Sequence, residues 1–355
     1  MKIPKLQIGS ITADVPIVQG AMGVRVSLSS LVSAVANEGG IGTIASVGLG
    51  DLDALEQEFE KECRENLIKE IHKAREKSDG HIAVNVMAAL SNADDLIKAA
   101  IGEGIKMIVV GAGLPLKLPR LVEDNSVNLV PIVSSRRATD LILGTWDKRF
   151  GRTADGIILE GPLAGGHLGF SREQLIQPDK YSLEILLPEV LEVLKPYEDR
   201  YGREIPVIVA GGIYTGQDIA TMLSRGASGV QLATRFVATV ECDVSQEFKQ
   251  AYLDAKEEDI ILIQSPVGLP GRAIRNKFLQ DLEIKGRFKD KCPYRCLATC
   301  KIAEAKYCIA KALLNSYFGD VDHGLIFAGH NAYRINSIVT VKDLFAELLQ
   351  ELAAA

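Results

Sequence analysis

The most constraining feature of this sequence is a set of short apolar runs, each followed by a helix-like stretch. The runs cover residues 15–18, 41–45, 82–86, 107–110, 129–133, 156–159, 205–209 and 229–232. Runs this short and this uniformly apolar are typical of strands buried on both faces, as in a parallel sheet. Eight β-then-α cycles match the length of a (β/α)8 barrel. We therefore predict an α/β protein with a TIM barrel.

A doubly wound open sheet is the alternative architecture. It is disfavoured because no Gly-x-Gly-x-x-Gly follows the first run and no acidic residue ends the second. Pro131 makes the fifth run less secure as a central strand. The predicted organisation is a barrel over residues 1–260. A lid loop, a Cys-rich segment and helices that pack on the barrel follow over residues 261–355 as a mostly helical C-terminal extension.

Composition restricts the partners that we expect. The net charge is −6 over 355 residues, which argues against binding to nucleic acid or to an anionic membrane. The chain contains no apolar run as long as a membrane span, and residues 1–5 lack the apolar region of a signal peptide. We expect a soluble cytoplasmic protein with a small-molecule substrate. Its oligomeric state stays open, with a homodimer as one alternative.

Polar residues and glycines gather directly after the predicted strands. In a barrel these positions share the catalytic face at the carboxyl ends of the strands. The loops after the seventh and eighth strands bring Gly211, Gly212 and Thr234 to this face, where bare N–H groups would form a phosphate-binding nest. The plainer interpretation of Ala-Gly-Gly is a tight turn. The other strand-end residues are Gln19–Met22, Ser46, Asn85, Gly111–Gly113, Glu160 and Gln231. Asn92, after the third strand, is predicted to cap the helix over residues 93–103.

His167 lies in a glycine-rich loop that follows the sixth strand, residues 160–170. Imidazole carries protons near neutral pH, so a histidine held beside a planar cofactor suits proton abstraction. The alternative is a flexible loop with a solvated histidine. His167 is our candidate catalytic residue.

Four motifs together resemble a known family. They are Gln19–Met22, Asn37–Gly42, Ala164–Gly169 and the block from Ile205 to Val240. The sequence is similar to the nitronate monooxygenase (formerly 2-nitropropane dioxygenase) family and to the related FabK-type flavin-dependent enoyl-acyl-carrier-protein reductases. The likeness covers residues 3–280 and 323–350.

The resemblance implies an FMN-binding barrel in which His167 is catalytic. The implied FMN contacts are Gly20, Ala21 and Met22 along the isoalloxazine ring, Ser46, Asn85 and Gln231 as polar contacts, Gly211, Gly212, Ala233 and Thr234 at the phosphate, and Gly166 beside the histidine. Ala21 and Ala233 stand where the family often has glycine. Both changes are small enough to keep backbone contacts.

The implied activity is a nitronate monooxygenase, which oxidises alkyl nitronates with O2 to a carbonyl compound and nitrite. One alternative uses the same fold as an NAD(P)H-dependent reductase of enoyl-acyl-carrier protein or of quinones. A basic rim of Arg272, Arg275, Lys277, Lys285 and Arg287 would suit an acyl-carrier partner. The other alternative is a flavin-binding redox sensor without turnover, built on the cysteines near residue 300.

Those cysteines set the chain apart from the simpler relatives. Cys292, Cys296 and Cys300 are four residues apart, so a helix would align them on one face, and Cys308 follows. Zinc or an iron–sulfur cluster is one interpretation, and buried thiols are the other. We assign no metal ligand. Residues 265–272 resemble a loop that returns over the active-site mouth, as a lid or as a plain connector.

Overall fold

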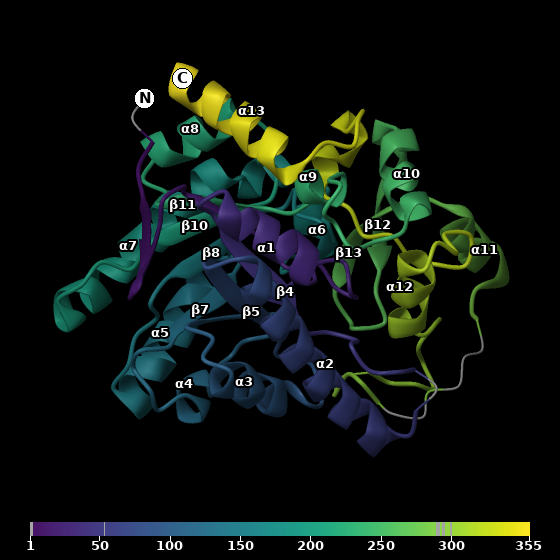
Figure 1. The fold of residues 1–355 in the computed structure, drawn as a ribbon, viewed down its shortest axis with the longest axis horizontal. Helices are drawn as coiled ribbons and strands as arrows, with labels where there is room; N and C mark the ends of the chain where they lie inside the picture. The colour runs from purple at the N-terminus through teal and green to yellow at the C-terminus, as the bar shows by residue number, and fades with distance from the viewer. Residues whose placement is uncertain (1–2, 53, 289–291, 293–294, 299) are drawn as a thin grey trace.

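The predicted barrel is confirmed by the computed structural model, which describes residues 3–52, 54–288, 292, 295–298 and 300–355. Eight parallel strands close in the order β10-β11-β3-β4-β5-β6-β7-β8 (Figure 1). The strands are β3 (Ile17–Gln19), β4 (Ile41–Ala45), β5 (His81–Met87), β6 (Met107–Gly111), β7 (Asn128–Val133), β8 (Ile157–Glu160), β10 (Val207–Ala210) and β11 (Gly229–Leu232). Pro131 lies inside β7 in register with Val110, so the proline does not exclude this strand from the barrel.

Helices follow the strands and cover the barrel from outside. They are α1 (Ser29–Asn37), α2 (Glu56–Lys77), α3 (Ala93–Gly102), α4 (Leu118–Leu121), α5 (Arg136–Phe150), α6 (Arg172–Leu175), α7 (Leu183–Tyr201), α8 (Gly216–Ser224) and α9 (Thr234–Val237). Local sequence sets several starts. Ser135 accepts a hydrogen bond from Ala138 N, and Thr215 and Asp218 form a capping box at α8. Asn92 stands at the start of α3, but its side chain makes no capping bond, so that predicted cap is wrong.

Two apolar layers hold the barrel together. One layer lies between the strands and the helices. The other fills the interior, where alternate strand residues such as Val18, Met107 and Ile208 meet side chains of the hairpin β1 (Leu6–Ile8) and β2 (Ile11–Ala13). The hairpin was not predicted from the sequence. Its apolar residues close the interior, so the carboxyl ends of the strands are left to form a site.

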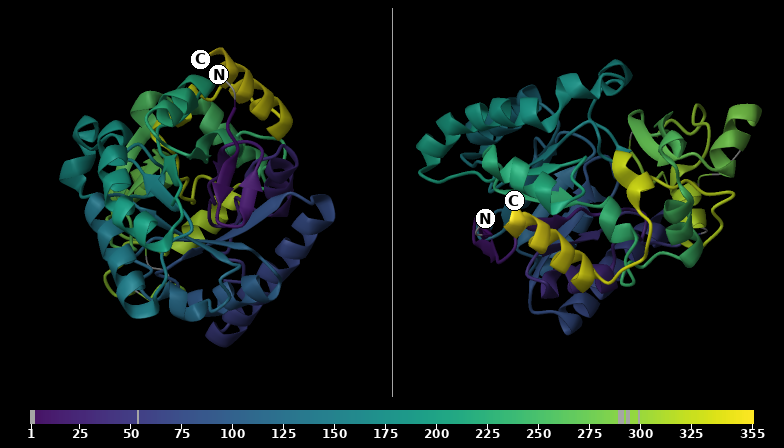
Figure 2. Two further views of the ribbon diagram at one scale, coloured as in Figure 1. Left: turned by 90° about the vertical axis from the view of Figure 1, so that its left-hand side faces the viewer. Right: turned by 90° about the horizontal axis from the view of Figure 1, so that it is seen from above.

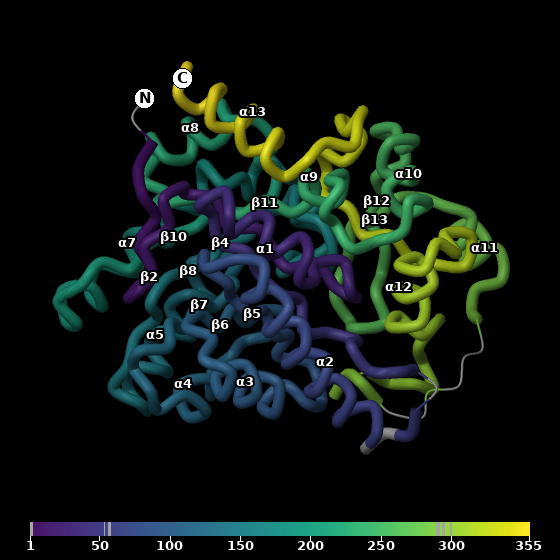
Figure 3. Tube along the Cα trace, in the orientation of Figure 1, coloured from purple at the N-terminus to yellow at the C-terminus, as the bar shows by residue number. Residues whose placement is uncertain are grey.

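The C-terminal extension contains helices and a hairpin. Helix α10 (Gln246–Asp254) precedes it, within the residues predicted for the barrel. The extension comprises β12 (Ile260–Gln264), β13 (Pro270–Ile274), α11 (Lys277–Lys285), α12 (Ile309–Tyr317) and α13 (Val341–Ala354). The hairpin, α11 and α12 gather at one end of the barrel (Figure 2). There β13 pairs with β9 (Gly166–His167). Helix α13 returns to pack on α1 and α8 (Figure 3). Within the described ranges, no helix has the length and apolarity to cross a membrane.

The helix that would align these cysteines is not found in the part of the segment that the structure describes. Cys292, Cys296 and Cys300 lie outside helices, and Leu297 forms a bridge with Leu90. Ser91 N donates to Cys296 O at 3.2 Å. Residues 296–298 thus pair with the loop after β5 and do not form a helix. Among the described residues, no three His, Cys, Asp or Glu side chains are placed to hold a metal ion.

Close backbone packing makes Gly42 a sensitive position. A Cβ at Gly42 in β4 would overlap the carbonyl of Val32 in α1, whereas one at Gly102 would meet nothing within 4 Å. We expect Gly42→Ala to lower the free energy of unfolding by about 2 kcal/mol or more, because α1 must move away from the barrel. Gly102→Ala, the matched control, should be neutral or stabilising by about 0.5–1 kcal/mol. Denaturant unfolding measures both, and equal effects would contradict the packing argument.

Candidate active site

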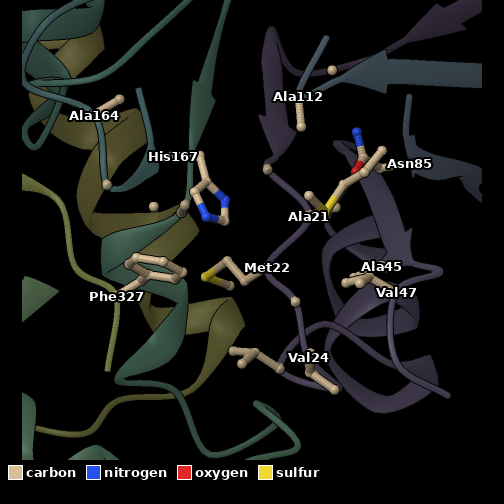
Figure 4. A pocket seen from close by; sticks show the side chains of 18 of the residues that line it. Ala21, Met22, Val24, Ala45, Val47, Asn85, Ala112, Ala164, His167 and Phe327 are labelled. Atoms are coloured by element: carbon tan, nitrogen blue, oxygen red, sulfur yellow. The ribbon is translucent and has the colours of Figure 1, made fainter. Parts of the chain in front are cut away.

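The predicted site residues line one cavity of about 290 Å³ at the carboxyl ends of the barrel strands. The structure thus brings together residues from separate cycles of the barrel. His167 projects from one wall towards Ala21 and Met22 on the opposite wall (Figure 4). The twelve are Gly20, Ala21, Met22, Ser46, Asn85, Gly166, His167, Gly211, Gly212, Gln231, Ala233 and Thr234.

A buried glutamine fixes the loop that carries Gly20 and Met22. The Gln19 side chain donates to Gly20 O and to Ser27 Oγ, and its Oε1 accepts from Thr43 N at 3.0 Å. Ser27 Oγ in turn accepts from Met22 N. These bonds satisfy a fully buried amide and hold the loop against β4. The wall beside the cavity is therefore preorganised.

The loop after β10 offers free N–H groups to the cavity. Gly211 and Gly212 have φ angles of +91° and +89°, a conformation that favours glycine. Within the described residues neither N–H donates a hydrogen bond. Asn331 Nδ2 donates to Gly212 O, and the Thr234 hydroxyl accepts from Gly329 N. Consecutive unpaired N–H groups form a nest for an anion such as a phosphate.

His167 is held in a sheet and not on a free loop. Gly271 in β13 is its register partner, and His167 Nε2 lies 2.7 Å from Ser265 Oγ in the turn of the β12–β13 hairpin. The Phe327 ring packs edge to face against the imidazole, with 4.9 Å between the two ring centroids. Burial lowers the pKa of His167 to about 4, because the charged imidazolium loses its hydration. The imidazole is therefore neutral at physiological pH.

A second titratable group faces the cavity at the end of β8. Burial raises the pKa of Glu160 to about 8, against the attraction of Arg272. Burial likewise lowers the pKa of Arg272 to about 10, against the attraction of Glu160. Arg272 is 4% exposed and donates to Ala164 O, so it does not belong to a surface basic rim as the sequence analysis expected.

Several residues that line the cavity or contact its lining were not predicted as site residues. Ser265 and Arg272 lay in the segment interpreted as a lid or connector, and the strand pairing that brings them to His167 was the missing information. Phe327 and Asn331 follow the Cys-rich segment without a motif. Asn92 was interpreted as a helix cap, yet it lines the cavity.

Comparison with known families agrees with this geometry. The family model described as nitronate monooxygenase matches residues 5–351. The chain belongs to the nitronate monooxygenase family. The suspected resemblance is thereby confirmed.

The chain is similar in sequence to curated proteins with two different names. A (3aS,4S,5R,7aS)-5-hydroxy-7a-methyl-1-oxo-octahydro-1H-indene-4-carboxyl-CoA dehydrogenase of Mycobacterium tuberculosis (strain ATCC 25618 / H37Rv) is 30% identical over 77% of this chain and 66% of its own length. A probable nitronate monooxygenase of Staphylococcus saprophyticus is 25% identical over 79% of this chain and 81% of the relative. The chain thus spans just under two thirds of the length of the dehydrogenase.

Solved structures share the fold. FabK from Thermotoga maritima is 27% identical, with a TM-score of 0.72 over 96% of this chain and 94% of FabK. Nitroalkane oxidase from Streptomyces ansochromogenes is 22% identical, with a TM-score of 0.73 over 96% of each chain. The latter likeness supports the family's barrel fold alone.

The raised pKa of Glu160 predicts a pH-dependent cost to folding. Its folded-state pKa of about 8 exceeds the ordinary value of 4.5 for a glutamate, so the cost is absent below pH 4.5 and grows as pH rises towards 8. In FMN-free protein we expect Glu160→Gln to raise the free energy of unfolding at pH 8 by on the order of 3 kcal/mol, and little at pH 4.5. Denaturant unfolding across this range measures it.

Glu76→Gln, at an exposed position of α2, is the control. A difference between wild type and Glu160→Gln that stays constant from pH 4.5 to pH 8 would contradict the assignment.

Proposed function

We propose that this protein is an FMN-dependent oxidoreductase that oxidises alkyl nitronates with O2 to a carbonyl compound and nitrite. The observation that carries the proposal is the placement of a neutral, oriented His167 and a glycine nest in one cavity. The family assignment supports an oxidoreductase of this class. The probable nitronate monooxygenase among the relatives points to the same substrate.

The residues present fit FMN. The unpaired N–H groups of Gly211 and Gly212 suit its phosphate. A Cβ at Gly20 would lie 3.1 Å from the Gln231 side chain, so glycine at this position leaves Gln231 its place in the cavity wall. Asn85 and Gln231 offer polar contacts to the heterocycle. Ala233 has a φ of −129°, so alanine is tolerated where the family often has glycine. When bound, FMN would supply electron transfer from the nitronate to O2.

The state of His167 indicates which form of the substrate reacts. An imidazole with a pKa of about 4 is a weak base towards a neutral nitroalkane. A neutral imidazole can still donate one N–H bond to the oxygen of a nitronate anion. We therefore favour a nitronate that forms before binding. Removal of the α-proton of a nitroalkane by His167 is the slower route, and it needs the tautomer that donates Nε2–H to Ser265 Oγ.

A second function is favoured by a specific observation. FabK from Thermotoga maritima is more similar in sequence than nitroalkane oxidase, at 27% against 22% identity. This likeness supports an NAD(P)H-dependent reductase of enoyl-acyl-carrier protein, with quinones as other acceptors. The burial of Arg272 removes one residue from the basic rim that an acyl-carrier partner would use.

The electron donor separates the two functions. We expect the FMN-loaded protein to lose its oxidised flavin absorbance when mixed anaerobically with propionate 3-nitronate, and to keep it with NADH or NADPH. Stopped-flow absorbance measures each reaction. Rapid bleaching by NADH or NADPH, with none by the nitronate, would contradict the proposal and favour the reductase.

The role of His167 is tested by substitution. We expect His167→Asn to reduce turnover of neutral nitroethane by about 10²- to 10⁴-fold, because proton removal is lost. Preformed ethylnitronate should lose less, because an amide N–H can still donate to the anion. Nitrite release measures both, with FMN content checked by absorbance.

His323→Asn is the matched control, since His323 lies on the surface with its side chain 66% exposed. Wild-type activity of His167→Asn on nitroethane would contradict the assigned role.

A further inference from the structure

One part of the cavity lining is mostly apolar and lies apart from the proposed flavin contacts in the sequence. We call it the α2–α12 arm. It is lined by residues of α2, of the loop after β5, of the Cys-rich segment and of α12: Phe59, Cys63, Leu90, Asn92, Cys296, Leu297, Ile309, Ala310 and Leu313. Its described lining carries no charged side chain, so a charged group there would lose hydration without compensation.

Hydrogen bonds and packing contacts join the walls of this arm into one structure. Gly50 N donates to Cys63 Sγ at 3.1 Å, and the space above Gly50 is filled by Phe59. On the other side, Leu90 bridges Leu297, and Ala298 N donates to Ala89 O at 2.9 Å. The Cys-rich segment thus closes the arm over the loop after β5.

Both cysteines in the arm have thiols that stay protonated at neutral pH. Burial raises the pKa of Cys63 to about 11 and that of Cys296 to about 12. Neutral thiols behave as small apolar groups, so these residues extend the apolar wall. They do not supply a nucleophile or an ionic contact.

Asn92 is the exception in this wall. It is 8% exposed, and Asn92 Nδ2 has no hydrogen bond partner within the described residues. The amide lies at the N-cap position of α3 and makes no capping bond. The Asn92 side chain lowers the pKa of the neighbouring Cys63 thiol, although burial raises it more. Sulfur is a weak hydrogen bond acceptor, so this contact does not replace a full hydrogen bond for Nδ2. A buried donor without a partner carries a cost that a ligand acceptor would relieve.

We propose that the α2–α12 arm binds an uncharged alkyl or acyl chain of the substrate, and that Asn92 Nδ2 donates to an ether or carbonyl oxygen in that chain. This inference rests on the proposed flavin site, which is part of the same cavity. It narrows the substrate class from small nitronates to chain-bearing ones.

Chain length is the first test. With 1-nitroalkane nitronates from nitroethane to 1-nitrooctane, kcat/KM should rise about two- to fourfold per methylene until the arm is full. Leu313→Trp should flatten this dependence, and Ala310→Leu serves as a second variant if the first fails to fold. Leu141→Trp, at a position 45% exposed on α5, is the control that should keep it. A wild-type kcat/KM that does not change with chain length would overturn the proposal.

The role of Asn92 is tested with ether analogues. A set of octyl-length nitronates with one CH2 replaced by oxygen should include one that wild type prefers over the all-carbon chain by about three- to tenfold. Asn92→Leu should abolish or reverse that preference. Identical preferences in wild type and Asn92→Leu would overturn the assigned contact.

Direct binding separates this inference from the proposed function. Calorimetry with 2-octanone, a neutral chain that needs no turnover, should show binding that Leu313→Trp or Ala310→Leu weakens at least tenfold. If 2-octanone binds in this way while no nitronate is oxidised, the chain-binding role of the arm is supported and the proposed function is wrong. If nitronates are oxidised while 2-octanone does not bind, the proposed function stands and the arm is wrong.

Discussion

Closure of a parallel sheet is the constraint on which this molecule depends. Eight strands that run in one direction place their carboxyl ends on one rim, where backbone groups and short side chains from distant parts of the sequence meet. The β1–β2 hairpin and the alternate strand residues fill the interior with apolar side chains. The rim is therefore where a cavity can form, and the site residues gather there.

Much of the barrel could be predicted because each strand is buried on both faces. An uninterrupted apolar run is the direct sequence consequence of that burial, and Gly211 and Gly212 stand where the chain must turn. Pro131 shows the limit of local rules, since a proline inside β7 does not prevent its pairing in the barrel. The placement of His167 in the cavity also followed from its position after a strand.

The remaining parts of the site depend on long-range pairing that local sequence does not encode. Ser265 reaches His167 because β13 pairs with β9, and that pairing joins segments about a hundred residues apart in the sequence. Leu297 meets Leu90 by a similar distant contact, and this pairing takes the place of the helix expected for the cysteines. Asn92 has the residue type and position of a helix cap, but its side chain faces the cavity. In each case tertiary contacts override a local preference.

The pairing of β9 with β13 makes the position of His167 depend on the β12–β13 hairpin. His167 belongs to the same small sheet as the β12–β13 hairpin, whose turn carries Ser265 and whose neighbour Val267 lines the cavity. A motion that swung this hairpin outward would therefore draw the imidazole away from Ala21 and Met22. The position of the hairpin and the position of the proposed catalytic histidine are therefore coupled through backbone pairing.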